Sequence, residues 1–241
     1  MDSLQIYYRT LSSDYEACLK HIQRKADAET IHELRVLIKQ IRAFYHFLAF
    51  ADTDFDFENH FGHIRILFKA AGKIRDIDIT LAEAGESSSL SEFLRQKRRR
   101  YVPKLRKACT EMLSEALGKD KEIERILPGI EEGSIKKFLV KIVSRFEKEK
   151  GKRITDRRLH DLRKLCKEYV YVSQASGYSG KFLSQTGTLQ NLTGKWHDKL
   201  IATDAISAFG KTENGNRELL DKLKKEERTM KKKAVRQFQI T

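Results

Sequence analysis

Apolar side chains recur every three to four residues along almost the whole chain, which is the period of an α-helix. No segment shows the strict alternation of apolar and polar residues that is typical of a half-buried β-strand. Only two prolines occur in the 241 residues. The clear interruptions are four short segments rich in turn residues, at 85–89, 128–134, 176–180 and 211–216. The pattern therefore predicts an all-α protein.

These interruptions separate eight predicted helices. We place them at 3–25, 29–50, 56–84, 90–118, 134–150, 155–175, 182–209 and 215–238. The segment 128–134 divides them into four and four. We therefore predict two antiparallel four-helix bundles, about 1–127 and 134–241, that together form a single domain over residues 1–241.

The predicted helix 29–50 carries a row of nitrogen-bearing side chains on one face. The row consists of His32, Arg35, Lys39 and Arg42. At about 100° per residue these side chains share an arc of roughly 80° and extend over about 15 Å of the helix axis. The leucines and isoleucines of the segment lie on the opposite face, toward the core. Burial of such cations without partners costs several kcal/mol per charge, so we expect an anion to lie along the row.

A related row begins in the second half of the chain. His160, Arg163 and Lys167 repeat the first three positions of the row, and Lys164 and Tyr171 lie beside them. Val170 stands where the first row has Arg42, so the second row is expected to be weaker by one cation. A solvated helix face gives no reason for histidine to begin both rows.

The helices that follow the two rows also correspond. Gly72, Lys73 and Asp76 match Gly194, Lys195 and Asp198 in spacing. Two matches in the same order indicate an internal duplication, and the two halves are predicted to be pseudo-symmetric.

Other charged residues on these helices are candidates for the same site. The additional anion-binding candidates are Arg65, Lys69, Lys73, Arg75, Lys164, Lys195, Lys224 and Arg228. We expect Asp76, Asp198 and Tyr171 to order the cations, although ordinary surface ion pairs explain the two aspartates equally well. The acid-free run 95–107 either extends the site or is solvated surface, and the sequence does not give its orientation.

Composition narrows the possible partners. The chain has 48 Lys and Arg against 34 Asp and Glu, a formal charge of +14 at pH 7, which attracts nucleic acid, polyphosphate or anionic surfaces. Three widely spaced cysteines argue against a disulfide framework and a thiolate metal site. The sequence has no signal-peptide pattern and no stretch near the ~20 apolar residues of a membrane span. We therefore expect a soluble cytoplasmic protein without a membrane partner.

Enzymatic function has little support in the motifs. The sequence has no P-loop, no HExxH and no Ser or Cys nucleophile motif. A metal-dependent phosphohydrolase would use His-Asp pairs such as His160–Asp161 and His197–Asp198, with His60 and His63 as further ligands, but the neighbouring cations repel a divalent metal. We predict no catalytic residue, no metal and no cofactor.

A helical nucleic-acid-binding protein is the main alternative. It would need aromatic side chains among the cations for base stacking, and the only candidates are Tyr101 and Trp196. Neither residue repeats in the other half. Nonspecific nucleic-acid binding stays open from the sequence.

The chain resembles the CHAD proteins, the conserved histidine α-helical domain family, over essentially its whole length. Four motifs occur in the order of the family: HELRVLIKQIR at 32–42, GKIRDIDI at 72–79, HDLRKLCKEYVY at 160–171 and LQNLTGKWHDKL at 189–200. The resemblance implies two pseudo-symmetric helical bundles around a basic groove or pore that binds inorganic polyphosphate without catalysis. It departs from the family at Val170, where a basic residue is usual, and at Lys39, where arginine is common.

The resemblance also implies which residues bind the anion and which proteins are partners. The anion-binding residues would be His32, Arg35, Lys39, Arg42, Arg75, His160, Arg163 and Lys167. A triphosphate tunnel enzyme or polyphosphate granule proteins would be partners, and the protein would reside in the cytoplasm or at polyphosphate granules.

Overall fold

The computed structural model describes the chain except for residues 1–2, 86–88, 115–120 and 211–216. All of its regular secondary structure in the described residues is helical, which confirms the all-α prediction. The helices are α1 (Ser3–Arg24), α2 (Ala28–Ala51), α3 (Phe57–Ala84), α4 (Ser89–Ser114), α5 (Lys121–Ile126), a 3-10 turn (Leu127–Gly129), α6 (Glu132–Glu147), α7 (Asp156–Ser176), α8 (Lys181–Gly210) and α9 (Arg217–Ile240).

Each of the eight predicted helices is present, and α5 is an addition. No helix was predicted at 121–126, between the predicted helix end at 118 and the predicted break at 128–134, because six residues are too few to produce a helical period. Ile123 and Ile126 are nevertheless buried, so tertiary packing holds this short helix. The predicted end of the fourth helix, residue 118, lies outside the described residues.

Side chains at the helix starts explain several boundaries. Asp27 caps α2 by accepting a hydrogen bond from the Thr30 backbone N–H at 2.9 Å. Thr155 caps α7 in the same way through the Arg158 N–H at 3.3 Å. Gly177 ends α7 in the left-handed conformation, with φ of 67°, which is the usual glycine C-terminus of a helix. The helices that bear the two rows therefore start at defined positions.

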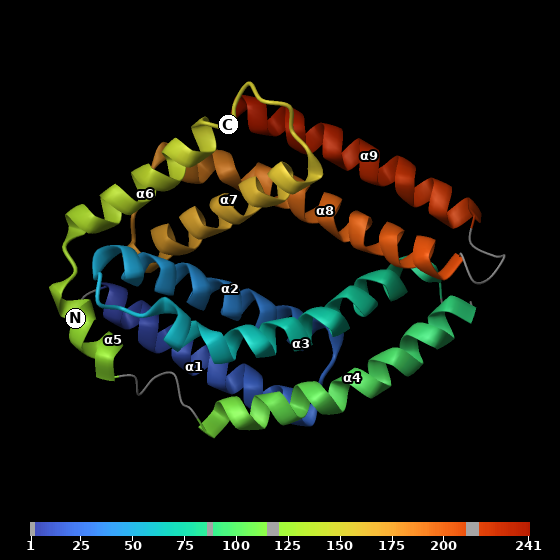
Figure 1. Cartoon of the computed structure of the whole chain (residues 1–241), viewed down its shortest axis with the longest axis horizontal. Coiled ribbons are helices and arrows are strands. Elements are labelled where there is room, and N and C mark those ends of the chain that lie inside the picture. The colour runs from blue at the N-terminus through green and yellow to red at the C-terminus, as the bar shows by residue number, and fades with distance from the viewer. Residues whose placement is uncertain (1–2, 86–88, 115–120, 211–216) are drawn as a thin grey trace.

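The helices of each half pack in chain order, and the halves meet at the centre (Figure 1). α2 contacts α1 and α3, and α7 contacts α6 and α8. Between the halves α2 packs against α7, and α3 packs against α8. α4 and α9 lie on the outside in Figure 1. Both helices with a cationic row are therefore central.

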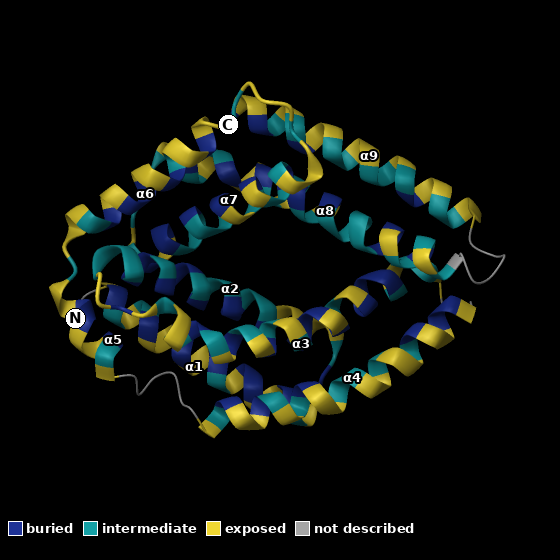
Figure 2. Ribbon diagram, viewed as in Figure 1, coloured by how far each residue is buried: buried dark blue, intermediate teal, exposed yellow. Residues whose placement is uncertain are grey.

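A hydrophobic core crosses both halves. Its main cluster includes the buried aromatic rings of Tyr8, Phe44, Phe47, Phe146 and Phe238. Smaller clusters join α3, α4, α8 and α9 around Ile206, and α7, α8 and α9 around Trp196. Figure 2 shows that α2 is mainly buried or intermediate, whereas α4 and α9 carry many exposed positions. Core packing thus fixes the central helices, and the outer helices present charge to solvent.

Part of the acid-free run 95–107 is structural. Arg98 Nε donates to the Asp78 carboxylate at 2.6 Å, and Asp78 has a side chain only 5% exposed. Arg98 Nη2 also donates to the Ala26 carbonyl at 2.8 Å, and Arg106 donates to the Ile22 carbonyl at 3.1 Å. These two arginines connect α4 to the inner helices.

No helix in the described part of the chain is long and apolar enough to cross a membrane.

Candidate functional site

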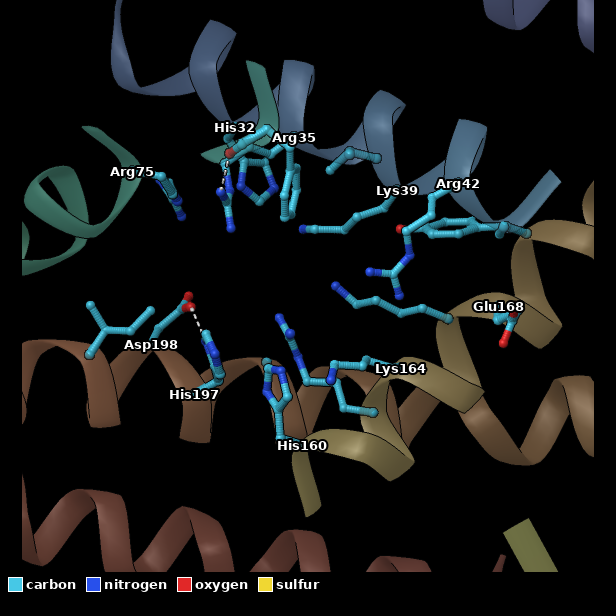
Figure 3. A pocket seen from close by; sticks show the side chains of 18 of the residues that line it. His32, Arg35, Lys39, Arg42, Arg75, His160, Lys164, Glu168, His197 and Asp198 are labelled. Atoms are coloured by element: carbon cyan, nitrogen blue, oxygen red, sulfur yellow. Dashed lines mark hydrogen bonds and ion pairs between the residues drawn. The ribbon is translucent and has the colours of Figure 1, made fainter. Parts of the chain in front are cut away.

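A cavity of about 320 Å³ lies where α2, α3, α7 and α8 meet (Figure 3). Seven lysine and arginine side chains line it against three carboxylates, and three histidines complete the ionisable set. The polar lining residues are His32, Arg35, Lys39, Arg42, Arg75, Asp76, His160, Arg163, Lys164, Lys167, Glu168, Tyr171, His197 and Asp198. The cavity, hereafter the central cavity, is therefore strongly cationic.

Helical periodicity places the two rows on its walls. α2 supplies lining residues at 32, 35, 36, 39, 42 and 43, and α7 supplies them at 160, 163, 164, 167, 168 and 171. These spacings keep one face of each helix toward the cavity. Figure 3 shows the α2 side chains directed toward those of α7 and α8. The prediction of two cationic helix faces is confirmed, and the two faces oppose each other.

Arg35 is held by three features of α3. Its Nη1 donates to the Phe68 carbonyl at 3.2 Å, and its guanidinium lies 4.3 Å from the centre of the Phe68 ring. A methyl group at Gly72 would approach Nη1 to 2.5 Å, so a larger residue there would displace the end of the Arg35 side chain. The guanidinium is therefore oriented before any ligand arrives.

Arg163, at the matching position of α7, has no such support. Its buried Nε has no hydrogen-bond acceptor among the described residues. A Cβ at Gly194, which corresponds to Gly72, would meet nothing within 4 Å. An unsatisfied buried N–H costs about 1–3 kcal/mol, more when it belongs to a charged group. An oxyanion in the central cavity could remove that cost by accepting this hydrogen bond.

Burial and neighbouring cations lower the pKa values of the lysines in the two rows. Burial, followed by the nearby Lys167, Arg35 and Arg163, lowers the pKa of Lys39 from 10.5 to about 6. Burial and Arg163 lower the pKa of Lys167 to about 8. The unliganded protein therefore holds more positive charge in this cavity than its own carboxylates neutralise.

The pKa values of two histidines in the cavity are lowered as well. Burial, Lys164 and His197 lower the pKa of His160 to about 4, and burial with Arg75 and Lys39 lowers the pKa of His32. Both imidazoles are neutral at pH 7 and can donate one hydrogen bond each. A bound anion would raise these pKa values because it stabilises the protonated forms.

Two aspartates, Asp76 of α3 and Asp198 of α8, line the central cavity. Asp198 Oδ1 lies 4.0 Å from His197 Nδ1, and the His197 ring stacks on His160 with 5.2 Å between centroids. Burial acts to raise the pKa of Asp198, but His197 and Arg75 outweigh it and the net shift is downward. Burial raises the pKa of Asp76, opposed mainly by Arg35. The contact between Asp198 and His197 fits the ordering role, which the sequence left open against a surface ion pair.

Six candidates for the site do not line the central cavity. They are Arg65, Lys69, Lys73, Lys195, Lys224 and Arg228. On α3, Lys69 and Lys73 lie about 20° and 60° beyond Asp76, which marks the edge of the arc that faces the cavity, and both are exposed. Lys195 is displaced in the same way from Gly194, and Arg65 pairs with Glu58 at 2.7 Å. The two remaining candidates belong to the outer helix α9.

The cavity also contains residues that the sequence did not assign to an anion site. His197 was considered only as a metal ligand, although it occupies the position in α8 that Arg75 occupies in α3, three residues after the matched glycines. Glu168, Phe68 and Ile201 also line the cavity, and none of them belongs to a predicted site. Lys164 corrects the expected weakness of the second row, because it supplies a third α7 cation in place of the one missing at position 170.

The aromatic residues that a nucleic-acid site would use, and the further metal-ligand candidates His60 and His63, lie outside the central cavity. Trp196 is fully buried and donates its indole N–H to Glu227 at 2.8 Å, so it cannot stack on a nucleic-acid base. Tyr101 packs on the hydrophobic core outside the central cavity. Within the described residues, no group of three or more His, Cys, Asp or Glu could hold a metal ion. His60 instead bonds to Glu122 at 3.1 Å.

Residues 9–207 match the sequence profile of the CHAD domain. The chain belongs to the CHAD domain family. Its fold resembles the crystal structure of the CHAD domain from the plant Ricinus communis, with a TM-score of 0.69 and 16% identity over 95% of this chain and 88% of that chain. It also resembles PptA from Streptomyces chartreusis, with a TM-score of 0.62 and 14% identity over 98% and 96% of the two chains. A comparison with curated proteins found no match.

Proposed function

We propose that this CHAD protein binds inorganic polyphosphate in the central cavity and does not catalyse a reaction. The observation that carries the proposal is the opposition of two cationic helix faces whose charges depress each other's pKa values. Such an arrangement is unfavourable until an anion of high charge density occupies it. Family membership adds support, because the CHAD resemblance implies polyphosphate as the ligand.

A chain of phosphates fits the cavity better than a single phosphate ion. The α2 row alone extends over about 15 Å from His32 to Arg42. The rows mix arginine, which can engage two oxygens at once, with lysine, which acts as a compact point charge. This mixture suits a repeating anion without a fixed shape. We expect affinity to come from many such contacts and from released counterions.

We further propose that the two halves arose by internal duplication and that each supplies half of the site. The pairs of matched positions that face the cavity support this idea: Arg35 and Arg163, Lys39 and Lys167, Arg75 and His197, Asp76 and Asp198, and Ile79 and Ile201. Two linked half-sites would bind a long chain more tightly than a short one, because the second contact becomes intramolecular.

A set of two triple variants tests the proposal. Replacement of Arg35, Lys39 and Arg163 by alanine should abolish binding of long-chain polyphosphate in a calorimetric titration. The matched control replaces Arg65, Lys69 and Lys195 by alanine. It removes the same number of cations, here from α3 and α8, and none of them lines the central cavity. We expect the control to change affinity by less than about threefold. Equal affinity of both variants would refute the cavity as the site.

Two further measurements on the wild-type protein would support the alternative functions. Displacement of polyphosphate by RNA at equal phosphate concentration would favour a nucleic-acid-binding protein. Stoichiometric divalent metal together with turnover of polyphosphate or triphosphate would favour a hydrolase. We expect neither, and we expect the protein in the cytoplasm or at polyphosphate granules, with a triphosphate tunnel enzyme or granule proteins as partners.

A further inference from the structure

A second depression, of about 650 Å³, lies between α2, α6 and α7 and adjoins the central cavity. The two share Arg42, Lys164 and Glu168 as lining residues. Beyond this junction the depression, hereafter the α6 groove, is lined by four more cations: Arg145, Lys148, Lys152 and Arg158. A continuous cationic path therefore leads from the interior of the protein to its surface.

The carboxylates of the α6 groove are already paired. Glu149 contacts Lys152 at 2.9 Å and Arg158 at 3.5 Å, and Asp161 contacts Lys164 at 3.0 Å. Glu168, at the junction, accepts a hydrogen bond from His46 Nδ1 at 2.6 Å.

Three cations of the path have no internal partner. Among the described residues, Arg42, Arg145 and Lys148 pair with no carboxylate. Arg145 and Lys148 are exposed, on the last turn and C-cap of α6. The positive charge of the α6 groove is therefore available to an outside anion.

The central cavity is electrostatically unequal at its two sides. Figure 3 shows Arg75 and Asp198 on one side and Arg42, Lys164 and Glu168 toward the other. Asp198 is kept ionised by its neighbours, as the downward shift of its pKa indicates. An anionic chain that extends beyond the cavity would be repelled near Asp198 and attracted past Arg42, where Glu149, Asp161 and Glu168 are already bonded to other side chains.

We propose that the α6 groove is a second subsite, which binds the part of a polyphosphate chain that continues out of the central cavity. The inference rests on the proposed function, because it takes the cavity as the first subsite. Short chains fill the cavity alone. Long chains also occupy Arg145 and Lys148, and this second contact gives the protein its preference for chain length.

Paired glutamine variants test the α6 groove. The groove variant carries Arg145→Gln and Lys148→Gln, and the control carries Arg100→Gln and Lys107→Gln, two exposed cations of α4 that line neither cavity. Both lose the same charge at exposed positions, and circular dichroism verifies that both fold. Each variant is titrated with tripolyphosphate and with long-chain polyphosphate over a range of salt concentrations.

We expect the groove variant to lose at least about tenfold in affinity for long chains and less than about twofold for tripolyphosphate, with the control unchanged. Its plot of log affinity against log salt should flatten by about 1 to 2, since each lost phosphate contact removes about 0.7 to 0.9. Equal losses in groove variant and control, or equal losses for both ligands, would overturn the second subsite.

The triple alanine variant of Arg35, Lys39 and Arg163 separates the two proposals. If it still binds tripolyphosphate as the wild type does, the central cavity is not the site and the proposed function fails. If it loses both ligands while the groove variant binds long chains like the control, the cavity stands and only the α6 groove proposal fails.

Discussion

Substitution of Lys39 by methionine should stabilise the unliganded protein while it weakens binding. The depressed pKa of Lys39, about 6 against 10.5, means that the folded state disfavours its ammonium form. One pKa unit corresponds to about 1.4 kcal/mol, so at pH 7 the penalty approaches 5 kcal/mol. Solvent and counterions in the cavity screen part of it. Because methionine retains an aliphatic stem without charge, we expect a gain of about 2–3 kcal/mol in the free energy of unfolding.

The pH dependence of this gain follows from the sign of the shift. Between pH 6 and 10.5 the unfolded chain binds a proton at Lys39 that the folded protein does not, so wild-type stability rises with pH in this window. The methionine variant lacks this contribution. Its advantage should therefore be largest near pH 6 and shrink toward pH 10.

Urea unfolding at low salt, followed by circular dichroism at pH 6, 7 and 9, measures the effect. Lys69→Met is the control, since Lys69 is an exposed lysine on α3 outside the central cavity, and it should change stability by less than about 0.5 kcal/mol. If Lys39→Met were no more stable than the wild type at pH 7, or if its advantage grew with pH, the account of charge repulsion in the cavity would be wrong.

Three other expectations follow from the structure. Gly72→Ala should lower polyphosphate affinity about tenfold by displacing the Arg35 guanidinium, whereas Gly194→Ala should not, because a methyl group there meets open space. Calorimetric titration compares the two variants, and equal effects would refute the role of Gly72 in positioning Arg35. Polyphosphate binding should be accompanied by proton uptake at pH 7–8, because Lys39 and Lys167 regain protons beside the anion, and affinity should therefore rise as the pH falls from 9 to 6. Calorimetry in buffers of different ionisation enthalpy measures the proton uptake, and proton release would contradict the prediction. Arg98→Ala should destabilise the fold by about 3–5 kcal/mol in urea unfolding because it leaves the buried Asp78 carboxylate unpaired, and a loss below 1 kcal/mol would argue otherwise.

Helical periodicity was sufficient to predict the fold class, the main helices and the cationic faces of α2 and α7. The fold class could be predicted because each long helix buries one apolar face, and the spacing of its leucines and isoleucines indicates that face. Helical periodicity could not predict α5, since two buried isoleucines in six residues give no period. That helix depends on its tertiary contacts.

The site was predicted less completely than the fold. The residues of the two rows line the central cavity together because residues three and four apart share one face of a helix. Lys69, Lys73 and Lys195 do not line the central cavity, because each lies outside the arc of its helix that faces the cavity.

His197 shows what a stricter reading of the repeat could have found. It corresponds to Arg75 once the glycines at 72 and 194 are aligned. By contrast, the α6 groove could not be predicted from sequence, because it combines the end of α6, the start of α7 and Arg42. Only the packing of the two halves brings these segments together.

The most direct test of the central claim is a titration of the wild-type protein with long-chain polyphosphate at two salt concentrations, with RNA as competitor. Seven cations in the central cavity predict tight binding at low salt and a slope of about −5 in log affinity against log salt, by analogy with single-stranded polyanions. RNA at equal phosphate concentration should not displace the ligand. Absence of binding at low salt, a slope near zero or ready displacement by RNA would contradict a polyphosphate site in this cavity.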